Sequence, residues 1–416
     1  MALRRAVVVP VPGSKSGAIR ALIVGALARG TTRVEGAPAS GDVRAVVKAL
    51  RALGVRIEGQ PVGGNLRIRG VAGSPPPGDR QLHLGGSATG FRMLACLAAL
   101  REGRTTLDGD ASLRRRPVGP IAETLAALGM RVGTRRGRPP VVVEGGPARR
   151  SAGTLAVDAS LTSQVASGLL LLGPFLRGGL RIRLNGRVVS EPYLDLTIEA
   201  LRRAGLRVRK AGRRISVGEG TPKATKAQIE PDWSSAAYPL VAGAILGRSV
   251  RVPGLRGDSL QADRAVLPLL RKAGVPCGVD ARGAWCRGEG RIRPFSVDLV
   301  DSPDLAPAAA VLALFAEGES RVSGAAHLRA KESDRIAACV DAVNALGGRA
   351  RATRDGFVVT GGTPRKGVVD SRGDHRIALA FSVAAAAIPG ARIHDRACVA
   401  KSWPSAWRDL APLLRR

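Results

Sequence analysis

A layout that recurs six times along the chain constrains the fold more than any other feature. Each copy has a polar turn, a long apolar helix, a closing glycine and a β-like run. The closing glycines are 73, 75, 69, 71 and 72 residues apart: Gly30, Gly103, Gly178, Gly247, Gly318 and Gly390. A second helix interleaves with the first at 50–54, 125–129, 201–205, 270–274, 343–347 and 410–414. This period predicts six strand–helix–strand–helix units with further strands, and six helix N-termini of one type that could converge.

Length and composition predict a globular protein of two domains. A chain of 416 residues, 45% of them hydrophobic, can bury a sizeable core in each domain. Aromatic residues make up only 3%, so the cores must consist of Leu, Val, Ile and Ala. No apolar run reaches the roughly 18 residues of a membrane span, and the N-terminus does not match a secretory signal. Five scattered cysteines without metal-ligand spacing indicate a reducing cytoplasm and no structural metal.

The net charge of +32 favours an anionic partner without identifying it. Nucleic acid is one candidate, but the basic residues are spread along the chain and few aromatic side chains are present to stack on bases. Only nine basic residues are lysines, which suggests a codon bias toward arginine. Three of these lysines, Lys15, Lys331 and Lys401, lie in the motifs described below. A lysine retained under such a bias fits a role for its compact, titratable ammonium.

The first polar turn, at 12–20, concentrates cations at a helix start. A valine-rich strand leads into it, Ser14 or Ser16 can cap the helix, and Lys15 and Arg20 lie where the helix dipole is already positive. A helix N-terminus of this kind binds anions readily. On this stretch alone, the pattern is also typical of an ordinary capped helix with two solvated charges.

Later turns carry further polar residues. Arg116 precedes Pro117 in a basic loop, and we expect it to point inward. Residues 162–164, Thr-Ser-Gln, offer neutral donors for hydroxyl and phosphate oxygens. The Arg-, Gly- and Pro-rich segment 134–154 predicts an exposed hairpin, and 218–230 has the character of a linker at a domain boundary.

The fifth and sixth units hold the most ionisable groups. Asp304 follows Pro303 at a helix start, and a helix beginning near Lys331 would put Lys331 and Arg335 one turn apart on one face. A salt-bridged, exposed helix start would give the same pattern. The sixth unit carries Asp374-His375-Arg376 and closes with 401–404, Lys-Ser-Trp-Pro.

Taken in order, these motifs resemble the 5-enolpyruvylshikimate-3-phosphate synthases, the enolpyruvyl transferases of the shikimate pathway, over essentially the whole chain. The motifs are Gly-Ser-Lys-Ser-x-x-x-Arg at 13–20, Arg-Pro at 116–117, Ser-Gln at 163–164, Pro-Tyr-x-Asp at 192–195, Pro-Asp at 303–304, Arg-x-Lys-Glu-Ser-Asp-Arg at 329–335, Asp-His-Arg at 374–376 and Lys-Ser-Trp-Pro at 401–404. The resemblance implies a mixed α/β fold of two similar domains, each of three βαβαββ repeats, closing over a central cleft. It places 15–228 in one domain and 1–14 plus 229–416 in the other, with hinges near 14 and 229.

The resemblance also implies a reaction and its residues. The 5-hydroxyl of shikimate-3-phosphate attacks C2 of phosphoenolpyruvate while C3 gains a proton, and then phosphate leaves as C3 loses a proton. The implied catalytic residues are Asp304 as base, with Lys15 and Glu332 as proton carriers. Shikimate-3-phosphate is assigned to Lys15, Ser16, Arg20, Thr162, Ser163, Gln164, Ser190, Asp304, His327 and Lys331. Phosphoenolpyruvate is assigned to Lys15, Ala88, Arg116, Gln164, Arg335, Arg376 and Lys401. No cofactor, metal, nucleic acid or membrane is implied, and a cytoplasmic monomer is expected.

Some positions depart from the family's usual pattern. Gly17-Ala18-Ile19 replaces a more polar run beside Arg20, Thr162 stands where serine is common, and His327 where some members have asparagine. Ala88 stands where many members have glycine. Its added methyl is expected to intrude on the phosphoenolpyruvate pocket and to weaken inhibition by the bulkier competitor glyphosate, unless it only packs beneath the turn.

Three alternatives remain open to test. The sister enzyme that acts on UDP-N-acetylglucosamine shares the fold and the chemistry, but uses a loop cysteine where this chain has Ala111, and an asparagine where it has Ser16. A non-catalytic nucleic-acid binder rests on charge alone. A paralogue with another cyclic acceptor would keep most of the same motifs.

Overall fold

The computed structural model describes residues 6–62, 64–146 and 153–415. The chain forms two compact units, which we call the N-half unit (Gly13–Ile229) and the C-half unit (Met1–Pro12 with Glu230–Arg416). The predicted division into 15–228 and 1–14 plus 229–416 lies within two residues of these boundaries. That the two units act as separate domains stays a prediction.

Three apolar helices, α1, α3 and α6, form the interior of the N-half unit. They are apolar on nearly all sides, because other elements surround them. The helices α2, α5 and α7 instead keep a polar face toward solvent. The bounds are α1 (Lys15–Leu27), α2 (Gly41–Ala52), α3 (Ala88–Ala98), α4 (Ala111–Arg114), α5 (Gly119–Ala127), α6 (Gln164–Leu172), η1 (Gly173–Phe175) and α7 (Pro192–Arg203).

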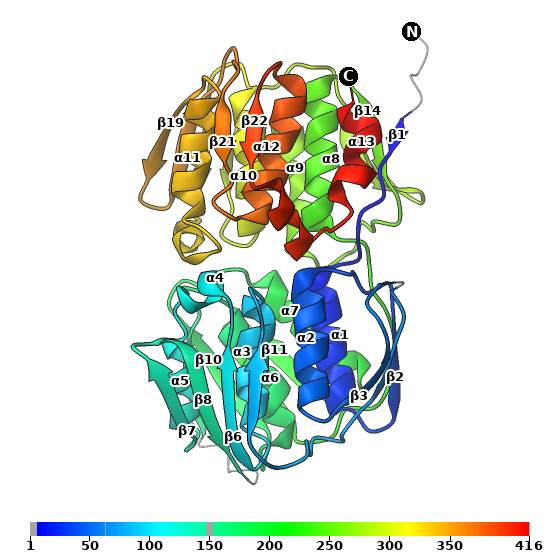
Figure 1. Cartoon of the computed structure of the whole chain (residues 1–416), viewed down its shortest axis with the longest axis vertical. Coiled ribbons are helices and arrows are strands. Elements are labelled where there is room, and N and C mark those ends of the chain that lie inside the picture. The colour runs from blue at the N-terminus through cyan, green and yellow to red at the C-terminus, as the bar shows by residue number, and fades with distance from the viewer. Residues whose placement is uncertain (1–5, 63, 147–152, 416) are drawn as a thin grey trace. The chain divides into compact units, whose positions relative to one another are not determined.

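Three four-stranded sheets belong to the N-half unit, in the orders β13-β2-β4-β3, β5-β6-β8-β7 and β11-β12-β10-β9 (Figure 1). Each sheet has one parallel pair and two antiparallel pairs. Residues of β10 alternate between buried and exposed, which directs one face of that sheet to the helices. The bounds are β2 (Thr31–Glu35), β3 (Arg56–Gly59), β4 (Leu66–Arg69), β5 (Arg80–His83), β6 (Gly103–Asp108), β7 (Arg131–Arg135), β8 (Arg138–Gly145), β9 (Thr154–Asp158), β10 (Leu180–Asn185), β11 (Val208–Ala211), β12 (Arg214–Val217) and β13 (Lys226–Gln228).

The C-half unit repeats this plan around α8, α10 and α12, which are buried along almost their whole length. Its core is separate from that of the N-half unit. The helical bounds are α8 (Trp233–Leu246), η2 (Ala262–Ala265), α9 (Val266–Lys272), η3 (Pro303–Leu305), α10 (Ala306–Leu314), η4 (Ala326–Ala330), α11 (Arg335–Ala345), α12 (His375–Ala387), η5 (Arg396–Lys401) and α13 (Ala406–Leu414).

The sheets of the C-half unit have the orders β1-β14-β16-β15, β17-β18-β20-β19 and β21-β22. The third is short because the chain reaches α13 directly after the sixth repeat's second strand and η5. The sixth unit is therefore a shortened copy of the predicted layout. The bounds are β1 (Val7–Val8), β14 (Ser249–Val252), β15 (Cys277–Asp280), β16 (Gly283–Arg287), β17 (Ser296–Asp298), β18 (Glu319–Ser323), β19 (Arg349–Thr353), β20 (Gly356–Thr360), β21 (Val368–Asp370) and β22 (Arg392–His394).

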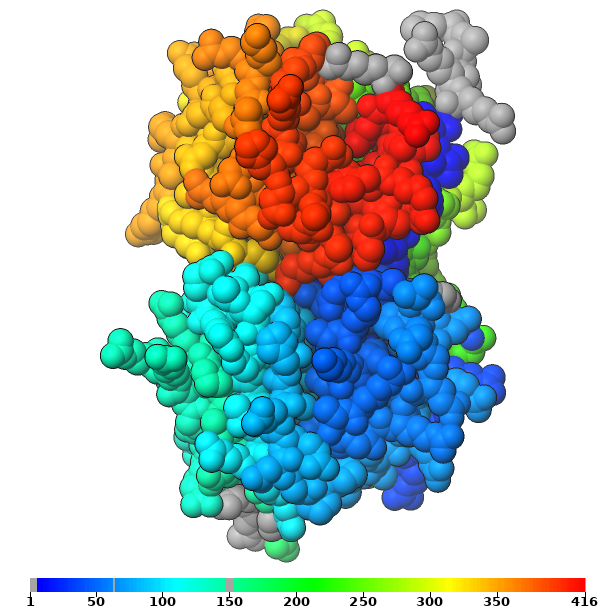
Figure 2. Space-filling view, in the orientation of Figure 1, coloured from blue at the N-terminus to red at the C-terminus, as the bar shows by residue number. Residues whose placement is uncertain are grey.

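The strands β1, just before the N-half unit, and β13, at its end, each pair with a strand that is distant in the sequence. β1 pairs in parallel with β14, although about 240 residues separate them in the chain. At the other end, β13 pairs in parallel with β2. The chain therefore passes twice between the units, at Pro12/Gly13 and at Ile229/Glu230. In the space-filling view, the blue residues of β1 lie among the green and red segments of the C-half unit (Figure 2).

Three local predictions need correction. The helix expected near Lys331 begins at Arg335, because Asp334 accepts hydrogen bonds from the first backbone N–H groups and caps it there. Lys331 directly follows η4 instead. The hairpin expected over 134–154 is formed by β7 and β8, and β8 buries three side chains, so it is not simply exposed. Residues 147–152 lie outside the described residues, and the predicted linker 218–230 contains β13.

Candidate active site

The first helix of the N-half unit starts at a capped, positively charged turn. The Ser14 hydroxyl accepts a hydrogen bond from the backbone N–H of Gly17 at 3.3 Å, which identifies Ser14 as the cap. Lys15 is the first helical residue, and its Nζ lies 2.9 Å from a carboxylate oxygen of Asp42. Asp42 is buried at the start of α2, so one helix start supplies the counter-ion for the other.

Arg20 lies one turn further along α1 and is 1% exposed. Its guanidinium donates to the Thr197 hydroxyl at 2.7 Å and to the carbonyls of Ser16 and Tyr193 at 2.9 and 2.8 Å. All three acceptors are neutral. Burial lowers the pKa of Arg20 to about 10, since a charge away from water is costly unless it is paired. An anion near this helix start would lower that cost.

The starts of α3 and α6 are joined by side-chain hydrogen bonds. Arg92 donates to the Gln164 side-chain oxygen at 2.8 Å, and the Gln164 amide nitrogen donates to the Thr89 hydroxyl at 3.1 Å. The Thr162 hydroxyl accepts from the backbone N–H of Gln164 at 3.2 Å. Arg92 also donates to the carbonyl of Pro117, which follows Arg116. The sequence alone did not predict Arg92 as a partner of Gln164.

The other predicted residues of the N-half unit lie at helix starts or in tight turns. Arg116 is 5% exposed, as its expected inward direction requires. Ala88 is the first residue of α3 and Ser163 precedes α6, and both are buried. Ser190 is also buried and adopts a left-handed backbone conformation with φ 56° just before α7. Ser16 is half-buried, and its carbonyl accepts from Arg20.

In the C-half unit, Asp304 lies between two arginines. One carboxylate oxygen accepts from Arg335 at 2.7 Å and the other from Arg376 at 2.5 Å. These residues come from η3 and from the first turns of α11 and α12. Burial alone would raise the pKa of Asp304, but the charges of Arg376, Arg335 and then Lys331 hold it well below its usual range. In this state Asp304 is a counter-ion rather than a base.

Arg335 is the centre of a larger ion-pair cluster. Its guanidinium also contacts Glu332 at 2.7 Å and Asp374 at 2.8 Å, and it is 1% exposed. Asp374 is fully buried and caps α12 by accepting from the backbone N–H of Arg376 at 3.0 Å. Burial would lower the pKa of Arg335, but the carboxylates of Asp374, Glu332 and Asp304 raise it above its ordinary value.

Two of the remaining predicted residues of the C-half unit, Lys401 and Lys331, act on this cluster. Lys401 ends η5, and its Nζ is 4.0 Å from a Glu332 oxygen. Lys331 is half-buried, and its charge helps to lower the pKa of Asp304. His327 is buried within η4. The structure therefore brings Asp304, Glu332, Arg335, Arg376 and Lys401 together.

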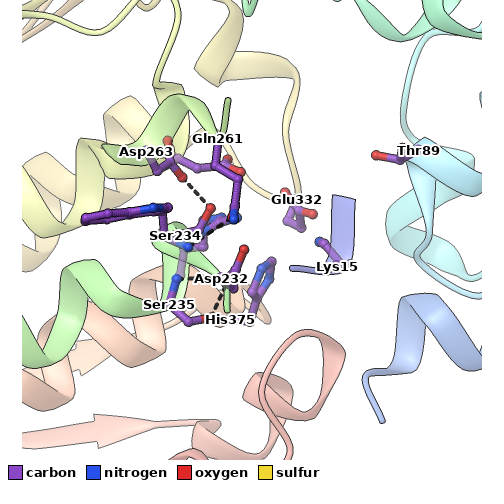
Figure 3. A network of polar contacts seen from close by, with 12 residues as sticks. Lys15, Thr89, Asp232, Ser234, Ser235, Gln261, Asp263, Glu332 and His375 are labelled. Carbon is purple, nitrogen blue, oxygen red and sulfur yellow. Dashed lines mark hydrogen bonds and ion pairs between the residues drawn. The ribbon is translucent and has the colours of Figure 1, made fainter. Parts of the chain in front are cut away.

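A second polar cluster surrounds the start of α8, where the sequence indicated only a cap (Figure 3). Asp232 caps the helix, accepting from the backbone N–H of Ser235 at 3.0 Å and from its hydroxyl at 2.6 Å. The Ser234 hydroxyl donates to Asp263 of η2. Gln261 accepts from the backbone N–H of Trp233 at 3.0 Å. The sequence could have drawn attention to Gln261 and Asp263 only through their polarity beside apolar neighbours.

In the described part of the chain, no group of three or more His, Cys, Asp or Glu side chains is arranged to hold a metal ion. Within the same ranges, no helix combines the length and the apolar character needed to cross a bilayer.

Comparison with known proteins identifies the family. The family model of EPSP synthase (3-phosphoshikimate 1-carboxyvinyltransferase) matches residues 4–410. The chain belongs to the EPSP synthase family. The family predicted from the motifs is thereby confirmed, and so is the enzyme class, a transferase of shikimate and aromatic amino-acid biosynthesis.

Similar proteins cover nearly the whole chain. The 3-phosphoshikimate 1-carboxyvinyltransferase of Methanopyrus kandleri is 40% identical over 96% of this chain and 94% of its own length. That of Aeropyrum pernix is also 40% identical, over 97% of this chain and 92% of its own length. An EPSP synthase structure from Acinetobacter baumannii has a TM-score of 0.81 and 30% identity, covering 98% of this chain and 96% of that one. The predicted fold class of this EPSP synthase family member is thus confirmed.

A structure with lower identity supports the fold alone. The enolpyruvyl transferase NikO from Streptomyces tendae has a TM-score of 0.77 at 19% identity, covering 99% of this chain and 95% of that one. The fold is therefore shared with an enolpyruvyl transferase of different name, and acceptor choice has to be argued from residues.

Proposed function

We propose that this EPSP synthase family member transfers the enolpyruvyl group of phosphoenolpyruvate to the 5-hydroxyl of shikimate-3-phosphate and releases phosphate. The observation that carries the proposal is Asp304, a carboxylate held by two buried arginines at adjacent helix starts. Both substrates carry phosphate and carboxylate groups, and arginine forks suit both kinds of anion. The proposal assigns residues of both units to the same two substrates.

Asp304 acts as the base, and substrate binding makes it able to accept a proton. With Arg335 and Arg376 on its two oxygens, its pKa is too low for it to accept a proton readily. A phosphoenolpyruvate carboxylate that takes over one or both guanidiniums neutralises their charge. The pKa of Asp304 then rises and the carboxylate becomes available to the acceptor hydroxyl. Arg335 and Arg376 thus bind phosphoenolpyruvate and, by leaving Asp304, allow that carboxylate to act as the base.

The proton and electron movements balance in two steps. In the addition step, the hydroxyl proton passes to Asp304, the oxygen forms a bond to C2 of phosphoenolpyruvate, and the double-bond electrons take a proton at C3. In the elimination step, the bond from C2 to the phosphate oxygen breaks, C3 gives up a proton and the double bond re-forms. The leaving phosphate takes up a proton as Asp304 gives one up, so the enzyme returns to its starting state. We assign the C3 proton to Glu332 and Lys15, which have counter-ions at 2.7 and 2.9 Å to hold them in place.

The binding residues follow the same logic of charge. We assign shikimate-3-phosphate to the helix starts of the N-half unit, where Arg20 donates to one hydroxyl and two carbonyls, and to Asp304, His327 and Lys331. We assign phosphoenolpyruvate to Lys15, Ala88, Arg116, Gln164, Arg335, Arg376 and Lys401. We also propose that the enzyme is a monomer and works in a reducing compartment, which suits its five free cysteines.

The deciding experiment is phosphate release from phosphoenolpyruvate with each of three acceptors. Shikimate-3-phosphate should support turnover, whereas unphosphorylated shikimate and UDP-N-acetylglucosamine should not. A reaction without acceptor gives the background. Turnover with either of the other acceptors, or none with shikimate-3-phosphate, would reject the proposed substrate pair.

A further inference from the structure

One buried carboxylate of the C-half unit has no role in the reaction described above. Asp263 lies in η2 and is 1% exposed. One of its oxygens accepts a hydrogen bond from the Ser234 hydroxyl, and its other oxygen, Oδ1, reaches no donor in the described part of the chain. A buried carboxylate with one oxygen unsatisfied is costly as an anion. Such a carboxylate tends to stay protonated, or it is kept ionised because its negative charge has a function.

The backbone around Asp263 is tied to the segment that carries Asp304. The Ser302 hydroxyl donates to the carbonyl of Ala262, the residue before Asp263, at 2.9 Å. Ser302 is also the residue from which η3, with Asp304, begins. On another side, Ser234 in the first turn of α8 is hydrogen-bonded to Asp263 (Figure 3). The segment η2 is therefore held both by Ser302 and by Ser234. Asp263 therefore cannot easily turn away to find another partner.

The charges that act on Asp263 come from η3, the start of α8 and α12. Burial is the largest effect, and with the negative charges of Asp304 in η3 and Asp232 at the start of α8 it raises the pKa of Asp263. The positive charge of Arg376 in α12 and the Ser234 hydrogen bond lower that pKa, and the balance is about 7. Arg264, next along η2, donates to the carbonyl of Gly257 instead.

We propose that Asp263 is a positioning residue for the reaction, whose protonation state sets how readily Asp304 accepts the proton of the acceptor hydroxyl. The interaction between two carboxylates is mutual: an ionised Asp263 raises the proton affinity of Asp304, and a protonated one does not. The role attached to Asp304 rests on the proposed function. The charge coupling between the two carboxylates does not.

The first test compares the pH dependence of kcat in wild type, Asp263→Asn and a matched control, Asp258→Asn. Asp258 lies on the preceding loop, is exposed and pairs with Arg256, so its variant makes the same change in net charge. The ratio of wild-type to variant kcat cancels the titration of the substrates' own phosphates. For Asp263→Asn this ratio should rise with pH through about 7. The rise should be about threefold to tenfold, since one pKa unit corresponds to a factor of ten.

The control ratio for Asp258→Asn should stay flat. A flat ratio for Asp263→Asn as well would overturn the proposal. Ser234→Ala provides a second variant if Asp263→Asn folds poorly. It removes the hydroxyl that lowers the pKa of Asp263, so the pH dependence of its kcat should shift to higher pH. An unshifted profile would also count against the proposal.

The second test needs no turnover. The folded-state pKa of Asp263 lies above its ordinary value of 3.8, so the unfolded chain ionises first and wild-type stability falls as pH rises from about 4 to 7. Asp263→Asn removes that loss. The melting temperature of Asp263→Asn minus that of wild type should therefore increase over this window and stay level above it. For Asp258→Asn the difference should not increase.

The coupling to Asp304 is tested by repeating the stability titration with Asp304→Asn as the parent. Removing that negative charge lowers the pKa of Asp263, so the titration midpoint should move to lower pH. An unmoved midpoint would show that the two carboxylates are not coupled and would overturn the inference. If the wild type does not release phosphate with shikimate-3-phosphate, the proposed function fails, and this titration still decides the coupling.

Discussion

The two units hold their buried arginines in opposite ways. In the N-half unit, the three acceptors of Arg20 are a hydroxyl and two carbonyls. In the C-half unit, Arg335 contacts three carboxylates, and Arg376 shares one of them. The first arrangement leaves a buried positive charge for a ligand to neutralise. The second neutralises the charge within the protein.

This difference indicates a division of labour. A site that always binds the same anion gains affinity from a cation that is not paired with a carboxylate of the protein. The ligand then does not have to break an existing ion pair. A site that must move protons needs carboxylates, and cations can hold them ionised until substrate arrives. Lys15 of the N-half unit differs from Arg20, since it pairs with Asp42. It is also the only residue there that we assign to proton transfer.

The largest expected effect comes from removing the centre of the C-half cluster. Arg335→Met leaves the fully buried Asp374, and also Glu332 and Asp304, without their shared cation. Breaking a buried pair in this way costs about 3–5 kcal/mol of unfolding free energy. Urea denaturation at pH 7 measures it. Arg291→Met, which removes an exposed partner of Glu317, is the control and should change stability by about 0.5 kcal/mol or less.

The pH dependence of this loss provides an independent check. In the wild type, the pKa values of Asp304 and Asp374 are lowered by their arginine partners, although burial opposes this. The stabilisation is therefore present above about pH 4 and is lost as pH falls below it. Without Arg335 the buried carboxylates prefer to be protonated, so the deficit of Arg335→Met should shrink from pH 7 to pH 5. A deficit that is constant over this range would contradict the charge explanation.

The next effect is on turnover. Arg376→Ala and Lys15→Ala each remove a charge that we assign to phosphoenolpyruvate, and losing one charge-assisted contact costs about 1.5–3 kcal/mol in binding. We expect kcat/KM to fall at least about 10- to 100-fold, with Arg408→Ala, an exposed arginine of the C-half unit, unaffected. Circular dichroism establishes that each variant is folded. Near-wild-type turnover in either variant would remove that residue from the site.

The fold and the charged residues of the candidate site could be predicted from the sequence, but the pairs that these residues form could not. The repeat period predicted the architecture because each unit carries the same turn and helix, and Arg116 next to Pro117 was correctly expected to be buried. The partners of the cations lie far away in the chain: Thr197 is 177 residues from Arg20, and Asp304 is 72 from Arg376. No local sequence pattern indicates a partner so far away in the chain, so only the structure reveals these pairs.

Local competition explains the main error in the sequence interpretation. The run at 329–335 offers helix-forming charges from Lys331 onward, but Asp334 is a better N-cap than any of them. The helix therefore begins at Arg335, directly after its cap Asp334 and not near Lys331, and the Arg335 side chain points into the ion-pair cluster. The sequence shows Asp374 only as part of a motif, and its two roles, as helix cap and as counter-ion of Arg335, appear only in three dimensions.

A smaller effect on stability, but a clear one on binding, is expected for Arg20→Gln. Because the partners of Arg20 are neutral, its loss leaves no buried charge, and unfolding free energy should change by about 1 kcal/mol or less. The rise in melting temperature on adding shikimate-3-phosphate should, however, disappear. Arg202→Gln is a control at an exposed position, because Arg202 also donates to a carbonyl, that of Val208, from the last turn of α7. If Arg202→Gln loses the ligand response equally, the two arginines are not functionally distinct.

The smallest expected effect concerns the methyl group of Ala88. Ala88 is 4% exposed at the first residue of α3 and belongs to the core of the N-half unit, so part of its methyl packs beneath the turn. Gly90 cannot provide the room instead, since a side chain there would meet Val46 at 2.4 Å. An intruding methyl costs at least about 1 kcal/mol through overpacking, which corresponds to about fivefold. Ala88→Gly should therefore lower the inhibition constant of glyphosate about fivefold, with a smaller change for phosphoenolpyruvate. Ala98→Gly, at the buried far end of the same helix, controls for lost helix stability and should leave both constants unchanged. Equal glyphosate constants for Ala88→Gly and its parent, or a tightly inhibited parent, would mean that the methyl only packs in the core.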